Sequence, residues 1–281
     1  MTTLALAIGG ALVIGACSES RSAQPAGQPL ADVPASPVDG GAERAADAGQ
    51  GGNDLARVGR DDLKYRAADD TAALRAGMIV GRISMAKDVS GDSAITPTHD
   101  LEVCKPFTDS RLPSAQRGVG NAVVWLLGVT KGPPQDASRR ATLMLERCQL
   151  APRVQRMATG GTVLVTSGDA MMSNLRFSSV GDAAVRATVA LNDAGQVVPN
   201  SEIGTTAGLV QVRDDRHPWV RAYIAVSSHP FVAVTSPDGA FKFDGVPPGA
   251  YTLLVWQEQL GVRTKAVRVT ERVSTRVSVE Y

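Results

Sequence analysis

The sequence predicts an all-β fold, with two small sandwiches that follow a disordered N-terminal tether. From Met78 to the end of the chain, short runs rich in Val, Ile, Leu and Thr alternate with Gly, Pro, Asn and Asp, which is the pattern of strands joined by turns. No stretch beyond residue 76 shows the period of a long amphipathic helix. Both observations favour antiparallel sandwiches or barrels over helical and α/β folds.

The first element is a short apolar stretch, residues 3–16. It lacks the roughly 20 residues of a membrane-spanning helix and is better explained as a signal peptide. Its last residues together with Cys17, Leu-Val-Ile-Gly-Ala-Cys, resemble the lipobox of bacterial lipoproteins. The resemblance implies that residues 1–17 are a lipoprotein signal, and that Cys17 carries a lipid that anchors the chain to the inner or outer membrane on its periplasmic side. The sequence departs from such signals at Thr2 and Thr3, where Lys or Arg is usual.

The second element, residues 18–75, is predicted to be a disordered linker. As far as Asn53 it consists largely of Ala, Gly, Pro, Ser, Gln and Asp, a composition that cannot bury enough apolar surface to offset the entropy of ordering. A short marginal helix is the alternative for residues 61–75, where Ala and Leu are scattered among charges. Because the net charge of the whole chain is only +1, we expect no nucleic-acid partner.

The third element, residues 76–226, is predicted to be a β-sandwich. Its candidate strands are residues 78–85, 122–127, 142–147, 162–166, 187–191, 209–213 and 221–226. Cys104 and Cys148 lie in this region and form a candidate disulfide if the protein is exported; two buried free thiols are the alternative.

The last element, residues 227–281, is predicted to be a second, smaller sandwich. Residues 236–239, Ser-Pro-Asp-Gly, have the composition of a tight turn. In the strand that follows, Phe241 and Phe243 point to one face and the polar residues between them to the other. Residues 238–253 resemble the carboxypeptidase regulatory-like, transthyretin-like β-sandwich, a resemblance that implies a fold and says almost nothing about activity.

Further segments extend a resemblance upstream: residues 121–126, 148–154, 217–226 and 229–231. Together they resemble bacterial periplasmic proteins in which a cupredoxin domain runs directly into the regulatory-like module. The resemblance implies a cupredoxin-like Greek-key sandwich for residues 76–226.

Copper-binding relatives of this kind hold a type 1 centre with two imidazoles, a thiolate and an axial thioether. The resemblance places Ser173 at the first imidazole, Asp214 at the thiolate and Val220 at the thioether, and retains only His217. Because three of the four ligands are missing, we expect no copper centre and no other cofactor. A packed or hydrogen-bonded structural role is the preferred interpretation of His217.

Other chemistry has little support in the sequence. Met171 and Met172 could offer soft donors, but adjacent strand residues face opposite sides, so core packing is the preferred role. The three histidines show no paired zinc-ligand spacing, and the sequence contains no G-x-S-x-G, P-loop or H-E-x-x-H motif. The Asp214-Asp215 pair is interpreted as a solvated surface turn and Glu258 as an isolated carboxylate, so we expect no enzyme.

The leading hypothesis is therefore a non-catalytic, lipid-anchored periplasmic structural or interaction protein, an accessory subunit that docks on a membrane redox complex of respiration or photosynthesis. The first alternative is an envelope carbohydrate- or peptide-binding module with Trp219, Tyr223 or Trp256 as exposed platforms. The second alternative is a residual copper-binding or electron-transfer protein around His217 and Met171.

Overall fold

Strands make up nearly all the regular structure of the computed structural model, which confirms the predicted all-β fold class. The structure describes residues 44–45, 54–55, 57–60, 62, 64–68, 75–87, 89, 91–181 and 184–281, all within one compact unit, residues 40–281. The predicted signal segment and the lipid site at Cys17 lie outside the described residues. No helix of the described residues is long and apolar enough to cross a membrane.

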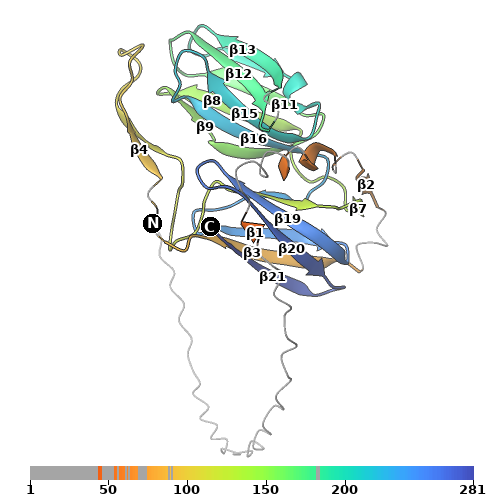
Figure 1. Cartoon of the computed structure of the whole chain (residues 1–281). Helices are drawn as coiled ribbons and strands as arrows, with labels where there is room; N and C mark the ends of the chain where they lie inside the picture. The colour runs from red at the N-terminus through yellow and green to blue at the C-terminus, as the bar shows by residue number, and fades with distance from the viewer. Residues whose placement is uncertain are drawn as a thin grey trace, which may run out of the picture. The chain divides into compact units, whose positions relative to one another are not determined.

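Two facing sheets, ordered β10-β16-β15-β12-β13 and β14-β11-β8-β9, form what we call the inserted sandwich (Figure 1). Their strands are β8 (Arg140–Glu146), β9 (Gln149–Ala151), β10 (Val154–Ala158), β11 (Thr162–Ser167), β12 (Ser173–Ser179), β13 (Val185–Leu191), β14 (Val197–Asn200), β15 (Gly208–Asp214) and β16 (Arg221–Ser227), with the 3-10 helix η1 (Glu202–Gly204). Alternate residues of both sheets point inward, among them Leu143, Val165, Phe177 and Ile224, and pack into one apolar core.

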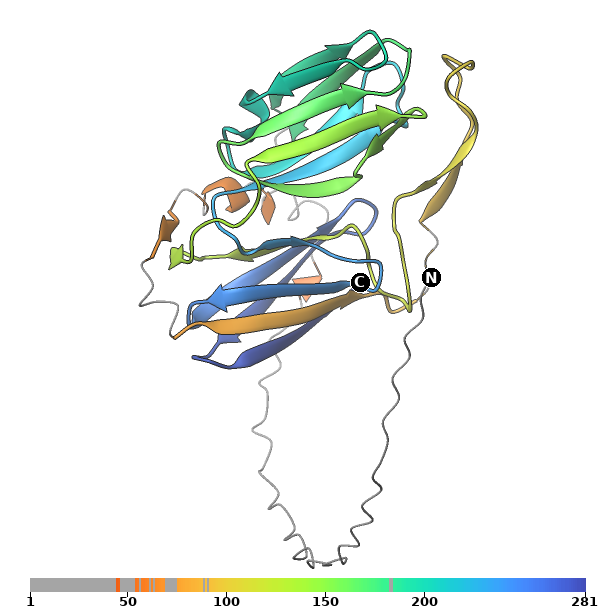
Figure 2. The same cartoon turned by 180° about the vertical axis from the view of Figure 1, so that it is seen from behind.

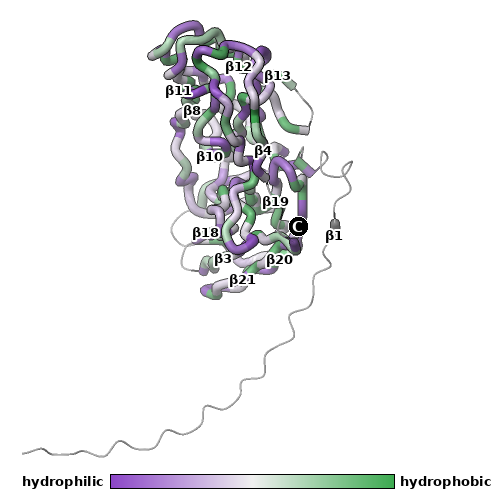
Figure 3. The backbone as a smooth tube through the Cα atoms, turned by 90° about the vertical axis from the view of Figure 1, so that its left-hand side faces the viewer, coloured by the Kyte–Doolittle hydropathy of each residue, from purple (hydrophilic) through white to green (hydrophobic). Residues whose placement is uncertain are grey.

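Two further sheets, ordered β1-β20-β19-β6-β17 and β18-β3-β21, form the terminal sandwich. Their strands are β1 (Arg44–Ala45), β3 (Gly77–Ser84), β6 (Val123–Leu127), β17 (Val232–Val234), β18 (Ala240–Val246), β19 (Gly249–Gln257), β20 (Gly261–Val269) and β21 (Ser274–Glu280). Buried and exposed residues alternate along β18. Figure 3 colours the whole backbone by the hydropathy of each residue. Phe241 and Phe243 both enter the core of this sandwich, as the alternation of the sequence predicted.

The predicted boundary between residues 226 and 227 does not separate the two sandwiches. β3 pairs with β18 on one side and with β21 on the other, and β6 pairs with β17 and β19. Two strands of the predicted domain 76–226 therefore belong to the terminal sandwich, and residues 140–227 are inserted between its strands β6 and β17.

β6 explains why this boundary was missed. All five of its residues are buried, because Val124 and Leu126 face the core of the terminal sandwich while Val123, Trp125 and Leu127 face a separate apolar cluster. That cluster also contains Tyr223 and other residues of the inserted sandwich. A strand covered on both faces has a continuous apolar run, and nothing in such a run tells which strands lie beside it.

Between β3 and β6, residues 91–122 form an arm that includes the hairpin of β4 (Asp92–Ile95) and β5 (Phe107–Ser110). The arm departs from the terminal sandwich and runs beside the inserted sandwich (Figure 2). It contacts both: Ala115 N–H donates to Pro237 C=O at 2.8 Å in the turn before β18, and Cys104 reaches the turn between β8 and β9.

The end of the predicted disordered linker is folded. Leu55 and Val58 are buried in the apolar cluster that residues of both sandwiches share, and Tyr65 is buried in the core of the terminal sandwich. β2 (Arg66–Ala67) pairs in parallel with β7 (Lys131–Gly132). The linker prediction for residues 18–75 is therefore wrong at these positions, because a few apolar side chains spaced along a polar segment were enough to dock it.

Candidate functional site

The four positions that the cupredoxin resemblance singled out lie at one end of the inserted sandwich. Ser173 begins β12, Asp214 ends β15, and His217 and Val220 lie in the loop before β16. β12 and β15 are paired here, because Asp215 N–H donates to Asn174 C=O at 3.2 Å. All four side chains are buried.

His217 is held by carboxylates on two sides. Its Nε2 lies 2.8 Å from Asp100 Oδ2 of the arm, and its Nδ1 lies 3.3 Å from Asp214 Oδ1. The ring packs edge-on against Trp219, with 5.5 Å between ring centroids. His217 is thus a buried hydrogen-bonded residue that fixes the tip of the arm. No signal in the sequence pointed to its partner Asp100, which lies 117 positions away.

Asp214 shapes the loop that carries His217. Its Oδ1 accepts hydrogen bonds from Arg216 N–H at 2.7 Å and His217 N–H at 3.1 Å, the geometry by which aspartate initiates a turn. Asp215 is the solvent-facing member of the pair and binds Arg176 at 3.0 Å. The interpretation of both residues as a solvated surface turn is therefore wrong for Asp214, because its side chain turns back to cap the loop.

The residues present do not fit a type 1 copper centre. That centre needs a thiolate and a second imidazole, and Asp214 and Ser173 offer hard oxygen atoms while Val220 offers an aliphatic side chain. The nearby thioether is committed elsewhere, since Met171 Sδ lies 3.5 Å from Cys148 Sγ and 3.7 Å from Cys104 Sγ. Among the described residues no group of three or more His, Cys, Asp or Glu side chains is arranged to hold a metal ion.

The two methionines lie on opposite sides of the chain. Met171 is buried in the core of the inserted sandwich, whereas 63% of Met172 is exposed. The predicted core-packing role is therefore wrong for Met172, because successive residues of an extended chain face opposite ways.

Cys104 and Cys148 form a disulfide, the pairing that the sequence left as one of two possibilities. The bond ties the arm to the turn between β8 and β9, where Arg147 and Cys148 both have positive φ. Asp169 accepts the backbone N–H groups of both turn residues, each at 2.8 Å. A covalent bond and a buried carboxylate therefore fix the same turn.

The three aromatic residues proposed as exposed platforms are buried. Trp219 packs against His217, and the rings of Tyr223 and Trp256 lie 4.6 Å apart in the shared apolar cluster. Burial raises the pKa of Tyr223, the nearby Glu258 carboxylate raises it further, and the hydroxyl accepts a hydrogen bond from Gln211. The prediction of platforms is wrong, because with few aromatic residues in the chain these side chains fill the core.

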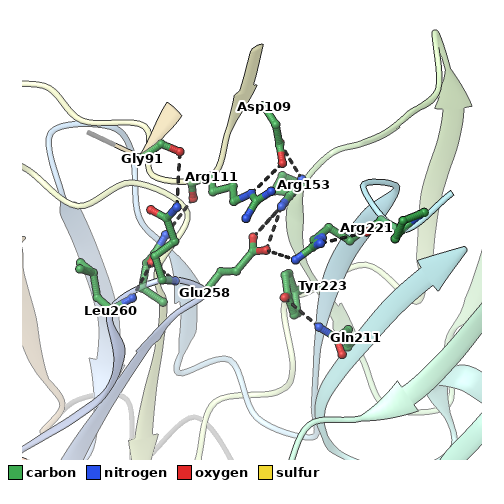
Figure 4. A network of polar contacts seen from close by, with 12 residues as sticks. Gly91, Asp109, Arg111, Arg153, Gln211, Arg221, Tyr223, Glu258 and Leu260 are labelled. Atoms are coloured by element: carbon green, nitrogen blue, oxygen red, sulfur yellow. Dashed lines mark hydrogen bonds and ion pairs between the residues drawn. The ribbon is translucent and has the colours of Figure 1, made fainter. Parts of the chain in front are cut away.

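Arg153 joins three segments through ion pairs (Figure 4). This residue, just before β10, contacts Glu258 after β19 at 2.8 Å and Asp109 of β5 at 2.9 Å. Arg221 lies 3.5 Å from Glu258, and Arg111 lies 2.8 Å from Asp109. Glu258, interpreted from the sequence as an isolated carboxylate, is the contact between the terminal sandwich and two arginines of the inserted sandwich.

A second buried contact fixes the segment before β2. Asp62 Oδ1 lies 3.0 Å from His229 Nε2, Asp62 Oδ2 accepts Ser228 N–H at 2.9 Å, and Ser228 Oγ donates to Asp62 C=O at 2.6 Å. Phe231 N–H donates to His229 Nδ1 at 3.2 Å, so Nδ1 is the acceptor nitrogen of this ring and Nε2 is the nitrogen that faces the carboxylate.

Comparison with known proteins gives a domain family for part of the chain. Residues 203–277 match the family model of polysaccharide lyase family 4, domain II. The match spans β15 to β21 and includes the segment in which the sequence resembles the regulatory-like module. No curated protein sequence matches the chain.

Among solved structures, the chain is similar to cupredoxins. Amicyanin from Paracoccus versutus is 19% identical, with 34% of this chain and 84% of that chain covered and a TM-score of 0.28. The purple cupredoxin from Nitrosopumilus maritimus is 18% identical, with 31% and 99% covered and a TM-score of 0.26. These scores are too low to carry an argument about function.

Proposed function

We propose that the protein is a non-catalytic envelope protein, anchored by a lipid at Cys17, that presents a firmly joined pair of sandwiches to a protein partner. One observation carries the proposal: the buried histidine and glutamate side chains that could otherwise bind a ligand or a metal hold segments of the chain together. His217 binds the arm, His229 binds the segment before β2, and Glu258 binds two arginines of the inserted sandwich.

The class of partner that we propose is a membrane redox complex, to which the protein contributes as an accessory subunit. The support is the resemblance of residues 76–226 to cupredoxins, scaffolds that commonly dock on such assemblies. Ser173 and Asp214 offer hard oxygen atoms and Val220 offers no donor atom, which argues for binding without electron transfer.

The experiment is a pull-down from native membranes in gentle detergent, through a tag placed after Tyr281. Stable recovery of one membrane redox complex is the expected result. The matched control is Cys17→Ser, which we expect to release the protein from the membrane fraction and reduce recovery of the complex. Recovery of no complex, or an unchanged membrane distribution of Cys17→Ser, would contradict the respective part of the proposal.

Copper titration tests the chemistry separately. Purified protein is expected to bind copper no more tightly than the variant His217→Ala, as measured by absorbance and metal analysis. Stoichiometric, tight binding that His217→Ala abolishes would replace the present proposal with a copper protein.

A second candidate function is binding of an envelope polysaccharide, which the match to polysaccharide lyase family 4, domain II, favours. A cleft of about 240 Å³ is lined by two ion pairs, Arg156 with Asp136 at 2.9 Å and Lys242 with Asp244 at 2.8 Å. Adjacent donors and acceptors of this kind suit vicinal hydroxyl groups.

Calorimetric titration with envelope polysaccharide fractions tests this candidate. Lys242→Ala is expected to weaken binding, whereas Lys131→Ala, an exposed lysine of β7 outside the cleft lining, is expected to leave it unchanged. Equal binding by both variants would exclude the cleft as the site.

A further inference from the structure

The outward face of the sheet β14-β11-β8-β9 is unusually apolar. Ala141, Leu143 and Leu145 of β8 point into the core, so the residues between them face outward. By the same alternation, and by the register of the sheet, the central part of the outward face consists of two rows. These rows are Val197-Thr166-Met144-Ala151 and Pro199-Leu164-Thr142.

Neither row contains a charged side chain. Met144 and Val197 are 42% and 56% exposed. The outward face of the opposite sheet is different, because Arg176 of β12 lies beside Arg213 of β15 and Thr188 of β13 there. A solvent-facing side of a sheet is normally polar, and contiguous apolar patches are typical of interaction sites; five of the seven residues in these rows are apolar.

The free edge of this sheet is poorly suited to adding another strand. Ser167 N–H donates to Gln196 C=O, so in the antiparallel pairing of β14 with β11 the backbone groups of Val197 and Pro199 point away from β11. Pro199 has no N–H to offer at that edge. A partner is therefore more readily accommodated on the face than on the edge.

The two ends of the patch carry opposite charges, an arrangement that is complementary to a second copy of itself. On β8 the outward residues run from Arg140 to Glu146, with Thr142 and Met144 between them. Within the described part of the chain, neither Arg140 nor Glu146 has an ion-pair partner. A twofold axis in the plane of the patch, crossing β8 at Leu143, would place β8 antiparallel to its copy, with Arg140 opposite the second copy's Glu146 and each row against the other row.

We propose that this face is a homodimer interface, with a second copy of this chain as its occupant. The four strands comprise 20 residues, and at about 3.3 Å per residue and about 4.8 Å between strands they cover roughly 320 Å² on each copy. The total of roughly 640 Å² lies below the lower limit of about 1,000 Å² for stable specific interfaces, as expected of a transient one. The dimer is consequently weak, and its dissociation constant lies in the micromolar range or above.

Sedimentation velocity on the purified full chain, from micromolar to sub-millimolar concentration, tests the interface. Cys17→Ser is present in every sample, so that no lipid group drives association. A concentration-dependent dimer is the expected result, and Val197→Glu is expected to weaken it by at least about tenfold because the new carboxylate is buried without a partner. Val185→Glu is the matched control, because Val185 is 58% exposed on the opposite sheet and is expected to have no effect.

A charge exchange tests the proposed orientation. Arg140→Glu alone and Glu146→Arg alone are each expected to weaken the dimer, since each places like charges opposite one another. The double variant is expected to restore it. A chain that stays monomeric at every concentration, equal effects of Val197→Glu and Val185→Glu, or a double variant weaker than both single variants would each overturn the proposal, and circular dichroism confirms that every variant is folded.

Discussion

The inserted sandwich is built from one continuous stretch, β8 to β16, whereas the terminal sandwich is assembled from β1, β3, β6 and the five strands β17 to β21. The first is fastened to its arm by a disulfide and by the contact of His217 with Asp100. The second is held by an apolar core and by the register of distant strands. The contiguous unit is joined to its arm by a covalent bond and a polar contact, while the unit drawn from separate segments depends on close packing and on its turns.

The contact between the sandwiches should be the most sensitive point of the molecule. Glu258→Ala leaves Arg221 without its carboxylate and Arg153 with Asp109 alone, and we expect it to lower the free energy of unfolding by about 3–5 kcal/mol. Urea denaturation measures the change. Lys242→Ala, which breaks the exposed pair with Asp244, serves as the control and should cost less than about 1 kcal/mol; equal losses in the two variants would contradict a special role of the junction.

Loss of the disulfide should act on the inserted sandwich. The bond closes a loop with a sequence separation of 44 residues, for which chain entropy predicts a stabilisation of up to about 4 kcal/mol. The double variant Cys104→Ser/Cys148→Ser is expected to melt earlier, with hydrogen exchange increasing first in the arm and the β8–β9 turn. An increase that begins instead in β18 or β21 would show that the two sandwiches do not differ in this way.

The terminal sandwich should be most sensitive at the turn before β18. Gly239 has a φ of +80°, and a Cβ there would lie 1.9 Å from Ile83 O, so Gly239→Ala is expected to cost more than about 2 kcal/mol. Gly261→Ala is the control, since its φ of +75° is similar and no other atom lies within 4 Å of its Cβ position. Thermal unfolding that is equal for the two would rule out close packing as the cause.

The smallest effect concerns acid stability at the same turn. A hydrogen bond from Ser236 lowers the pKa of the Asp238 carboxyl, and Ala240 N–H lowers it further. The contribution of Asp238 is therefore present above its unfolded pKa of about 3.9 and is lost as the pH falls through the lower folded value. Asp238→Asn should flatten the acid end of the stability curve slightly, and an unchanged curve would mean that the turn does not depend on this charge.

Much of the fold could be predicted from the sequence, because strand alternation and turn composition are local. The inward positions of Phe241 and Phe243 followed from such signals, whereas the grouping of Ser173, Asp214 and His217 was implied by the cupredoxin resemblance. The partners of those residues did not. Asp100 lies 117 positions from His217 and Glu258 lies 105 positions from Arg153, and no periodic pattern records which charged residues meet across such distances.

The burial of the aromatic residues was also beyond the sequence. Aromatic side chains such as Trp256 and Tyr223 occur both in exposed binding platforms and in buried cores, so the residue type does not distinguish the two roles. The packing of one sandwich against the other decides between them, since both rings lie in the cluster that the two share. The fold class could be predicted from local patterns in the sequence. The surroundings of the candidate site residues depend on contacts among the two sandwiches and the arm, which local patterns do not record.

The parallel pairing of β3 with β21 joins Met78 to Ser274, so the sheet β18-β3-β21 cannot close until a strand that emerges roughly 200 residues later has left the ribosome. During synthesis one edge of β3 is therefore open to solvent or to a chaperone. Truncation by even the last seven residues would leave that edge bare in the finished molecule and make it a target for aggregation or proteolysis.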